Sequence, residues 1–217
     1  MKPLFQYQAF IFDMDGTLVD SMPYHEKSWD LFFEEHQIEL DKETFERDYH
    51  RGTLEEVMGR LFPHLTKVAD RKAIGQRKEE LFRELYAPHL DCLSGLRDFL
   101  NSVLVQNIPM GLATMGDQNN IDFTLGGLEL THFFQATTGG DQVNHGKPHP
   151  EIFLQTAKKL DVDAKHCLAF EDTRSGIASA QAAGMDVVGI ATMFSKIELL
   201  ELGCVQAVRD YNELVLV

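Results

Sequence analysis

Cysteines and long apolar runs are both scarce in this sequence. Three cysteines occur among 217 residues, scattered without the spacing of a metal-binding or redox motif. Such a set excludes a disulfide framework and is typical of reduced thiols in the cytoplasm. No apolar stretch reaches the roughly 20 residues that a membrane-spanning helix needs, and the first residues lack a signal-peptide pattern. We therefore expect a cytoplasmic protein without a membrane partner.

Basic charge is also scarce. Lys and Arg number 20 against 34 Asp and Glu, which gives a formal net charge of −14. Because no basic stripe is present to neutralise a phosphate backbone, the composition argues against nucleic acid as a partner. The negative charge also weakens long-range attraction of anionic substrates. A site that handles phosphate in this chain must rely on a bound cation and on a few local basic groups.

Short apolar segments alternate with helical patterns over most of the chain. Apolar runs predict strands at 9–12, 109–114, 133–137, 167–170, 187–190 and 205–208. Helical spacing of apolar residues is present over 96–104, 119–128, 150–160 and 175–183. Strands that alternate with helices predict an α/β fold with a mostly parallel sheet, covered by helices on both faces.

Residues 22–92 interrupt this alternation. Apolar residues there recur at three- and four-residue spacings with charged residues between them, which predicts three or four amphipathic helices. The charged run Arg77–Glu80 is typical of a solvated helix face. We therefore expect an α/β core formed by 1–21 and 93–217, with a small helical cap domain at 22–92. Hinges near 20–22 and 88–94 would let the cap close and exclude water.

The segment 8–21 carries the most specific pattern. An apolar strand is followed at once by Asp13 and Asp15, one residue apart, and then by Gly16, which allows a tight turn. Two such carboxylates are unfavourable in an apolar core. They are expected near the carboxyl edge of the sheet, where open α/β folds place ligands. One can attack as a nucleophile, the other can move protons, and both can hold Mg²⁺ through oxygen. A solvated acidic loop is the alternative.

Three later segments bring polar side chains to predicted strand ends and loops. Thr114 offers a hydroxyl that can donate to a phosphoryl oxygen or cap the next helix. Lys147, held between a glycine and a proline, offers a compact positive charge, unless it is an ordinary exposed lysine. Glu171 and Asp172 end a buried strand, and their alternative role is to cap the helix that follows.

These four segments resemble, in order and in spacing, the four signatures of the haloacid dehalogenase superfamily, whose members are mostly phosphatases and phosphomutases. The resemblance extends from residue 8 to about residue 190. It implies a Rossmann-like parallel sheet with an inserted cap. It also implies that Asp13 forms an aspartyl-phosphate while Asp15 acts as general acid and base. Dehalogenases of the superfamily lack the second aspartate, so Asp15 favours phosphoryl transfer.

The same resemblance assigns roles to the other polar residues. Thr114 and Lys147 would orient the phosphoryl group, and Lys147 would also restrain the nucleophile. Glu171 and Asp172 would complete a Mg²⁺ site with the nucleophile carboxylate and the main-chain carbonyl of Asp15. The cation would offset the repulsion between an anionic nucleophile and an anionic ester.

The segment from Asp20 to His25 resembles the β-phosphoglucomutase branch and its sugar-phosphatase relatives. The resemblance implies that His25 lies at the hinge between cap and core and binds near the acid–base aspartate. Arg51 resembles a residue of the cap loop that leans over the substrate, and Lys78 resembles a cap lysine that faces the active site. A position on a solvated helix surface is the alternative for each of these basic residues.

Two features depart from the mutases of this branch. Near Glu55 the mutases carry an arginine that grips the second phosphate of a bisphosphate, and a carboxylate there would repel it. Met115 and Gly116 replace a Ser-rich loop at the substrate. We therefore expect a monomeric, Mg²⁺-dependent phosphatase whose partner is a small phosphorylated metabolite, a phosphate monoester such as a sugar phosphate. The alternatives are a β-phosphoglucomutase-type mutase, an inorganic pyrophosphatase of the same branch and a non-enzymatic binding protein.

Overall fold

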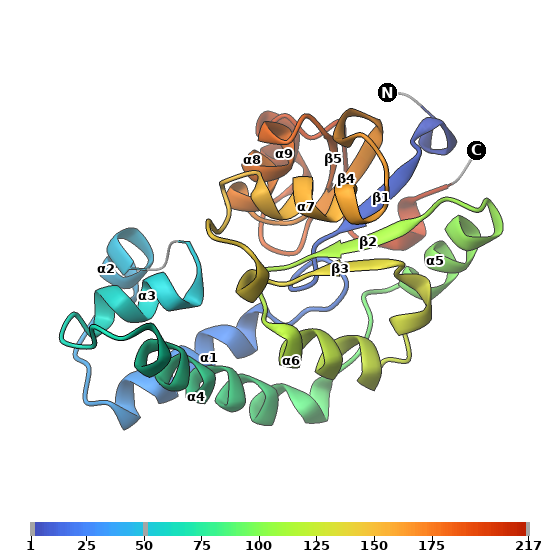
Figure 1. Cartoon of the computed structure of the whole chain (residues 1–217). Helices are drawn as coiled ribbons and strands as arrows, with labels where there is room; N and C mark the ends of the chain where they lie inside the picture. The colour runs from blue at the N-terminus through green and yellow to red at the C-terminus, as the bar shows by residue number, and fades with distance from the viewer. Residues whose placement is uncertain (1–2, 50–51, 216–217) are drawn as a thin grey trace. The chain divides into compact units, whose positions relative to one another are not determined.

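The computed structural model describes residues 3–49 and 52–215. The chain divides into an α/β unit, Met1–Asp20 with Asp91–Val217, and a helical unit, Ser21–Leu90 (Figure 1). The sequence-based division ends the first segment at residue 21 and the second at residue 92, one and two residues later than these units do. The role of the helical unit as a cap stays a prediction.

Within the described residues, six parallel strands form the sheet of the α/β unit. They are β1 (Ala9–Phe12), β2 (Met110–Ala113), β3 (Ala136–Thr138), β4 (Cys167–Glu171), β5 (Asp186–Ile190) and β6 (Gln206–Val208). Their order is β3-β2-β1-β4-β5-β6, and every neighbouring pair is parallel. The first strand therefore lies in the middle, between β2 and β4. The α/β fold with a parallel sheet is confirmed.

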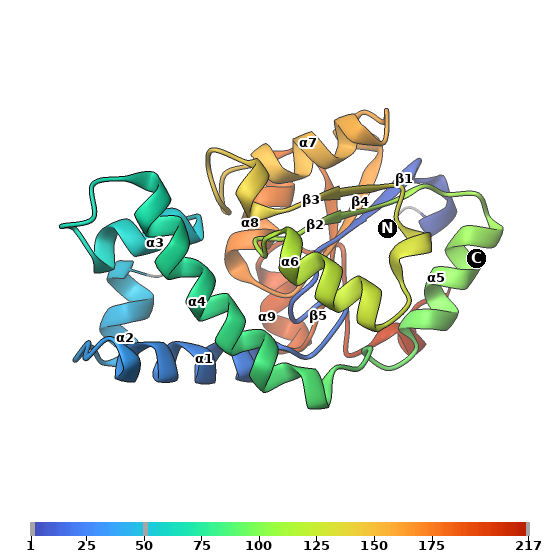
Figure 2. The same cartoon turned by 60° about the horizontal axis from the view of Figure 1, so that its bottom comes forward.

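Helices cover both faces of this sheet. Three of them, α7 (Glu151–Lys159), α8 (Arg174–Ala182) and α9 (Lys196–Glu201), lie on one face, called here the α7–α9 face. The other face carries α5 (Leu96–Val105) and α6 (Gln118–Ile121), as Figures 1 and 2 show. Short 3-10 turns lie at Leu4–Gln6, Ala87–His89, Thr131–Phe133, Gly140–Gln142, Ala164–His166 and Tyr211–Glu213.

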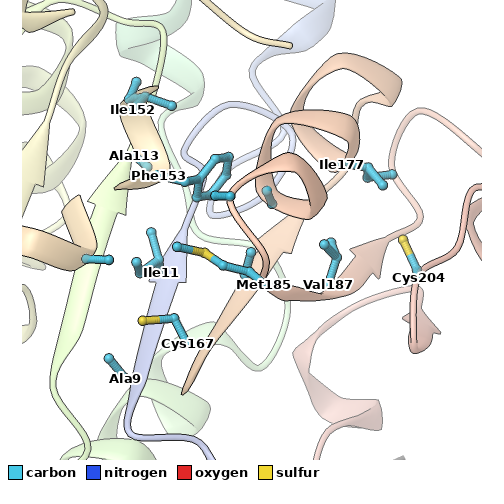
Figure 3. Packing of buried hydrophobic residues seen from close by; sticks show 14 of the residues in the cluster. Ala9, Ile11, Ala113, Ile152, Phe153, Cys167, Ile177, Met185, Val187 and Cys204 are labelled. Atoms are coloured by element: carbon cyan, nitrogen blue, oxygen red, sulfur yellow. The ribbon is translucent and has the colours of Figure 1, made fainter. Parts of the chain in front are cut away.

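The alternation of side chains along β1 decides what each face packs against. Ala9 and Ile11 join Phe153 of α7 in the cluster of buried residues on the α7–α9 face (Figure 3). Phe10 faces the opposite side, where Phe99 of α5 stacks on it at a centroid distance of 6.2 Å. The strand is thus buried on both faces, which is why it reads as a continuous apolar run.

Three segments differ from the predicted secondary structure. The third strand begins at Ala136 instead of residue 133, because Thr131–Phe133 form a 3-10 turn. The helix α6 is short and continues as a π turn, Asp122–Gly126. The prediction lacks α9, although Ser195 and Glu198 form a capping box at its start, a signal that the sequence carries.

The helical unit contains α1 (Met22–Glu35), α2 (Lys42–Thr44), α3 (Leu54–Leu61) and α4 (Val68–Tyr86), with a π turn at Phe45–Tyr49. Its own buried cluster consists of aromatic and aliphatic side chains: Trp29, Phe32, Phe45, Val57, Met58, Phe62 and Leu81. The unit therefore has a hydrophobic core of its own. Among the described residues, no helix combines the length and apolar character that crossing a membrane requires.

Candidate active site

The carboxyl ends of β1, β2 and β4 bring four predicted site residues to one edge of the sheet. Asp13 follows β1, Thr114 follows β2, and Glu171 ends β4 with Asp172 directly after it. The first strand pairs with both of the others, and the Asp13 N–H donates to the Phe170 carbonyl at 3.0 Å. This edge is where open α/β folds bind ligands.

Lys147 reaches the same edge from the loop before α7. Its ammonium donates to Asp13 Oδ1 and Glu171 Oε1, both at 2.6 Å, and to the Ala113 carbonyl at 3.0 Å. The same nitrogen lies 5.0 Å from the centroid of the Phe153 ring. Because Lys147 is only 7% exposed, it is not an ordinary surface lysine. The ammonium thus forms hydrogen bonds at the ends of three neighbouring strands, β1, β2 and β4.

Negative charge exceeds positive charge in this cluster. Asp13, Glu171 and Asp172 are buried, and each offers an oxygen within 4.8 Å of the others. Burial raises the pKa of Asp13 to about 8, although Lys147 lowers it, and the charge of Glu171 adds to the rise. Burial, followed by the charges of Glu171 and Asp13, also raises the pKa of Asp172 well above its ordinary value. Burial lowers the pKa of Lys147, but the charges of Asp13 and Glu171 outweigh it and leave that pKa raised.

The donor set fits a hard divalent cation. Carboxylate oxygens are the ligands that Mg²⁺ prefers, and the three buried carboxylates lack an equal positive charge. The turn after β1 lets Asp172 come close, because Gly16 has a φ of 78° and a Cβ there would overlap the Asp172 carboxylate. Asp13, Glu171 and Asp172 are therefore the residues that could hold such a cation.

Two threonines that the sequence does not single out lie against the Asp172 carboxylate. Thr17 Oγ1 donates to Asp172 Oδ1 at 3.2 Å. Thr192 Oγ1 donates to the Gly16 carbonyl at 2.7 Å and lies 3.3 Å from Asp172 Oδ2. A hydroxyl has one hydrogen, so the shorter contact takes it. Thr192 lies two residues beyond the end of β5, so the sequence does place it near a strand end.

Thr192→Val should weaken the Mg²⁺ binding predicted for this cluster by about tenfold, because the Thr192 hydroxyl holds the turn at Gly16 beside Asp172, and residues that support a metal ligand typically contribute at least that much. Valine keeps the branched shape but lacks the hydroxyl, so the free energy of unfolding should also fall by about 1 kcal/mol. Titration calorimetry with Mg²⁺ and chemical denaturation measure the two effects. Thr192→Ser keeps the hydroxyl and is the matched control. Equal Mg²⁺ affinity in the two variants would contradict the assignment.

Both oxygens of the Glu171 carboxylate are engaged. While Oε1 accepts from Lys147, Oε2 accepts from the N–H groups of Asp172 and Thr173 at 2.9 and 3.0 Å. A Cβ on Gly176 would overlap this carboxylate, so glycine is needed at the start of α8. The residue that caps α8 is Thr173, which accepts from the Gly176 N–H. The helix-capping alternative is therefore wrong for Asp172, while Glu171 supports the turn before the helix.

Thr114 is buried at the end of β2, and its Oγ1 accepts from the Gly116 N–H at 3.0 Å. The residue that caps α6 is Asp117, so the capping alternative is wrong for Thr114. The Gly116 carbonyl accepts from the Gly140 N–H at 2.9 Å, which joins the loop after β2 to the loop after β3. Met115 packs against the α7–α9 face.

Asp15 lies two residues beyond Asp13 and is half-buried. It forms a parallel bridge with Val19, and the Gly16 N–H donates to the Val19 carbonyl at 2.8 Å. The negative charge of Asp15 contributes to the raised pKa of Asp13, so the two carboxylates interact electrostatically. Partial exposure suits a group that exchanges protons with substrate and water.

Two predicted residues of the helical unit contact each other. Lys78 Nζ lies 3.0 Å from His25 Nδ1, and the His25 ring stacks on Phe82 with centroids 3.6 Å apart. Lys78 is 3% exposed and His25 is half-buried. The alternative of a solvated helix surface is therefore wrong for both.

The other two predicted residues of this unit are Glu55 and Arg51. Glu55 Oε1 forms an ion pair with Arg71 Nε at 2.6 Å, and both side chains are partly buried. The carboxylate is thus neutralised by a neighbour, which the sequence analysis did not anticipate. Arg51 lies outside the described residues.

Comparisons with known proteins identify the family. Fructose-1-phosphate phosphatase YqaB of Escherichia coli is 31% identical over 192 residues, 85% of this chain and 97% of the relative. The β-phosphoglucomutase of Bacillus subtilis is 31% identical over 190 residues, 84% of this chain and 83% of the relative. A crystal structure of a HAD hydrolase, family IA, variant 3, from Entamoeba histolytica matches with a TM-score of 0.83 at 30% identity, covering 96% of this chain and 95% of the other. The family model described as haloacid dehalogenase-like hydrolase matches residues 10–190, and this chain therefore belongs to that family.

Proposed function

We propose that this hydrolase is a Mg²⁺-dependent phosphatase that hydrolyses a small phosphorylated sugar through a phosphorylated Asp13. The observation that carries the proposal is the buried Asp13 carboxylate, held by Lys147 at 2.6 Å beside two further carboxylates. Its family and relatives make the chain a phosphoric monoester hydrolase. The Mg²⁺ requirement, the covalent intermediate and the sugar substrate go beyond that activity and belong to the proposal.

Asp13 and Asp15 divide the reaction between them. The Asp13 carboxylate attacks phosphorus, which forms an acyl phosphate and breaks the bond to the sugar oxygen. Asp15 gives its proton to that oxygen, so the sugar leaves as an alcohol. Asp15 then takes a proton from water as the water attacks the same phosphorus, which releases inorganic phosphate and restores Asp13. Asp15 lies two residues after Asp13 and is partly exposed, and both features suit this exchange of protons.

Asp13, Glu171 and Asp172, with the main-chain carbonyl of Asp15, would hold Mg²⁺. When bound, the cation neutralises the phosphoryl oxygens and the nucleophile that approaches them. Thr17 keeps the Asp172 carboxylate oriented through its hydroxyl at 3.2 Å.

Thr114 and Lys147 would donate to the phosphoryl oxygens. The three ammonium hydrogens of Lys147 already point to Asp13, Glu171 and Ala113. Contact with a phosphoryl oxygen therefore requires the exchange of one bond. The bond to the Ala113 carbonyl is the longest at 3.0 Å and the acceptor carries no charge, so we expect that bond to be exchanged.

A sugar monophosphate is favoured over a bisphosphate. The names of the Escherichia coli and Bacillus subtilis relatives both concern phosphorylated sugars, one as a phosphatase and one as a mutase. Where the mutases carry a gripping arginine, this chain has Glu55 paired with Arg71 at 2.6 Å. The pair weakens the repulsion expected from Glu55, but it also occupies a guanidinium that could grip a second phosphate. From the helical unit we assign a substrate contact to His25.

A phosphate-release screen should find sugar monophosphates hydrolysed ahead of phosphoglycolate, nucleotides and pyrophosphate. Release should require Mg²⁺, because three buried carboxylates beside one ammonium do not attract an anionic ester on their own. EDTA should abolish release and added Mg²⁺ should restore it. Bisphosphate-primed interconversion of two sugar phosphates, without net release of phosphate, would instead identify a mutase.

A further inference from the structure

The C-terminal 3-10 turn of the α/β unit begins with a buried tyrosine that the proposed mechanism does not use. Tyr211 is only 2% exposed. Its ring centroid lies 6.5 Å from that of Phe12 and 6.3 Å from that of Phe170. Phe12 directly precedes Asp13, and Phe170 directly precedes Glu171. The tyrosine ring therefore packs against the two strands whose ends carry the nucleophile and the acidic pair.

The hydroxyl of Tyr211 reaches the loop that follows β1. It donates to the main-chain carbonyl of Thr17 at 3.0 Å. The hydroxyl of Thr17 in turn donates to Asp172 Oδ1 at 3.2 Å. Thr17 is fully buried, and these two hydrogen bonds engage its main chain and its side chain. Tyr211 is thus linked through one residue to a carboxylate of the candidate metal site.

Tyr211 is a permanent donor in this position. Burial raises the pKa of Tyr211 well above its ordinary value, and the negative charges of Asp13 and Asp172 raise it further. A neutral phenol can donate to a carbonyl, whereas a phenolate could only accept. The hydroxyl therefore keeps its proton, and its bond to the Thr17 carbonyl, at neutral pH.

Backbone hydrogen bonds hold the turn that carries this hydroxyl. The Tyr211 N–H donates to the Ser94 carbonyl at 3.0 Å, and Asn212 Nδ2 donates to Ser94 Oγ at 2.8 Å. The residue before Ser94 is Leu93, whose N–H donates to the Leu18 carbonyl at 2.9 Å. The position of the Tyr211 hydroxyl therefore does not depend on its bond to Thr17 alone.

We propose that Tyr211 is a positioning residue for Mg²⁺: its hydroxyl, acting through Thr17, holds the Asp172 carboxylate in the orientation that receives the cation. The inference rests on the proposed function, because it requires that Asp172 binds Mg²⁺. A phenylalanine ring would fill the same space, and a buried hydroxyl adds only modestly to stability, since its desolvation offsets most of the gain from its hydrogen bond. Orientation of the loop is what the hydroxyl adds.

Tyr211→Phe tests the proposal, because it removes the hydroxyl and keeps the ring. Titration calorimetry of the full chain with Mg²⁺, without substrate, measures the effect. The affinity for Mg²⁺ should fall about tenfold, since groups that orient a metal ligand typically contribute at least that much.

Tyr7→Phe is the matched control. Tyr7 is 4% exposed, and its hydroxyl donates to Asp186 Oδ2 at 2.7 Å. Tyr7 precedes β1 and Asp186 begins β5, so this bond lies at the edge of the sheet opposite to Asp13. Both variants lose one buried hydroxyl, so a general loss of stability would affect them alike. Tyr7→Phe should keep the Mg²⁺ affinity of the wild type within about twofold.

A double variant tests whether the effect passes through Thr17. Thr17→Val keeps the branched shape and removes the hydroxyl that contacts Asp172, so it should also weaken Mg²⁺ binding about tenfold. Without that hydroxyl, Tyr211 has no route to the carboxylate. Tyr211→Phe combined with Thr17→Val should therefore lose about tenfold in affinity, as Thr17→Val does alone, instead of about a hundredfold.

The possible failures are distinguishable. Equal Mg²⁺ affinity in Tyr211→Phe and Tyr7→Phe would overturn the positioning role and leave the proposed function standing. Losses that multiply in the double variant would overturn the route through Thr17. A wild type that binds no Mg²⁺ would instead end the proposed metal dependence, and the role of Tyr211 with it.

Discussion

Asp13→Asn should lower phosphate release by about 10⁴-fold or more on every phosphate ester that the wild type hydrolyses. An amide has no anionic oxygen with which to form the acyl phosphate, and losing the nucleophile of a covalent mechanism typically costs this much. The substitution preserves shape, and the amide oxygen can still accept from Lys147. Steady-state phosphate release measures the loss. Acid quenching with labelled substrate should trap phosphate on the wild type alone.

The stability of the same variant separates loss of chemistry from loss of fold. Three carboxylate oxygens lie within 4.8 Å of one another, so removing one negative charge relieves repulsion. The melting temperature of Asp13→Asn without metal should therefore equal or exceed that of the wild type. Intact-mass analysis must exclude deamidation back to aspartate. Residual turnover above about 1%, with the mass confirmed, would remove Asp13 from the mechanism.

The strand ends of this site could be predicted from the sequence. Apolar runs identify each strand, and parallel strands share a carboxyl edge, so Asp13, Thr114 and Glu171 are expected to meet there. The position of Lys147 could not be predicted in the same way. Its loop carries no periodic pattern, and its bond to Asp13 joins residues 134 positions apart. The resemblance to the superfamily supplied the pairing of Lys147 with Asp13. The structure shows this pairing as a buried ion pair with 2.6 Å between Nζ and Oδ1.

The charged run Arg77–Glu80 shows where a local pattern misleads. Four charged residues in succession predict a solvated helix face. Arg77 and Glu80 agree with this prediction, because their side chains are 38% and 54% exposed. Lys78 and Glu79 are buried instead, because they fall on the helix stripe that also carries Phe82. Charge and helical spacing give opposite predictions here. Only the packing of α4 against its neighbours decides between them, and that is a tertiary effect.

Lys147→Met should lower the free energy of unfolding by about 3–5 kcal/mol in the presence of EDTA, because it leaves two buried carboxylates without their ammonium. Methionine has a similar length and no charge, so the packing against Phe153 is largely kept. Turnover should also fall by about 10²–10³-fold, the usual cost of losing a donor to a charged transition state. Denaturant titration and phosphate release measure the two effects.

Mg²⁺ and a second substitution distinguish loss of charge from a packing defect in Lys147→Met. If the deficit in stability is electrostatic, Mg²⁺ should narrow it, because a cation bound by Asp13, Glu171 and Asp172 replaces the missing positive charge. Adding Glu171→Gln removes one of the stranded carboxylates, so the double variant should be more stable than the sum of the two single effects predicts. Lys158→Met, on the exposed side of α7, should change stability by less than about 0.5 kcal/mol. A Lys147→Met variant that unfolds with the wild type in EDTA would show that the ammonium does not balance these carboxylates, and the electrostatic account of the site would fall with it.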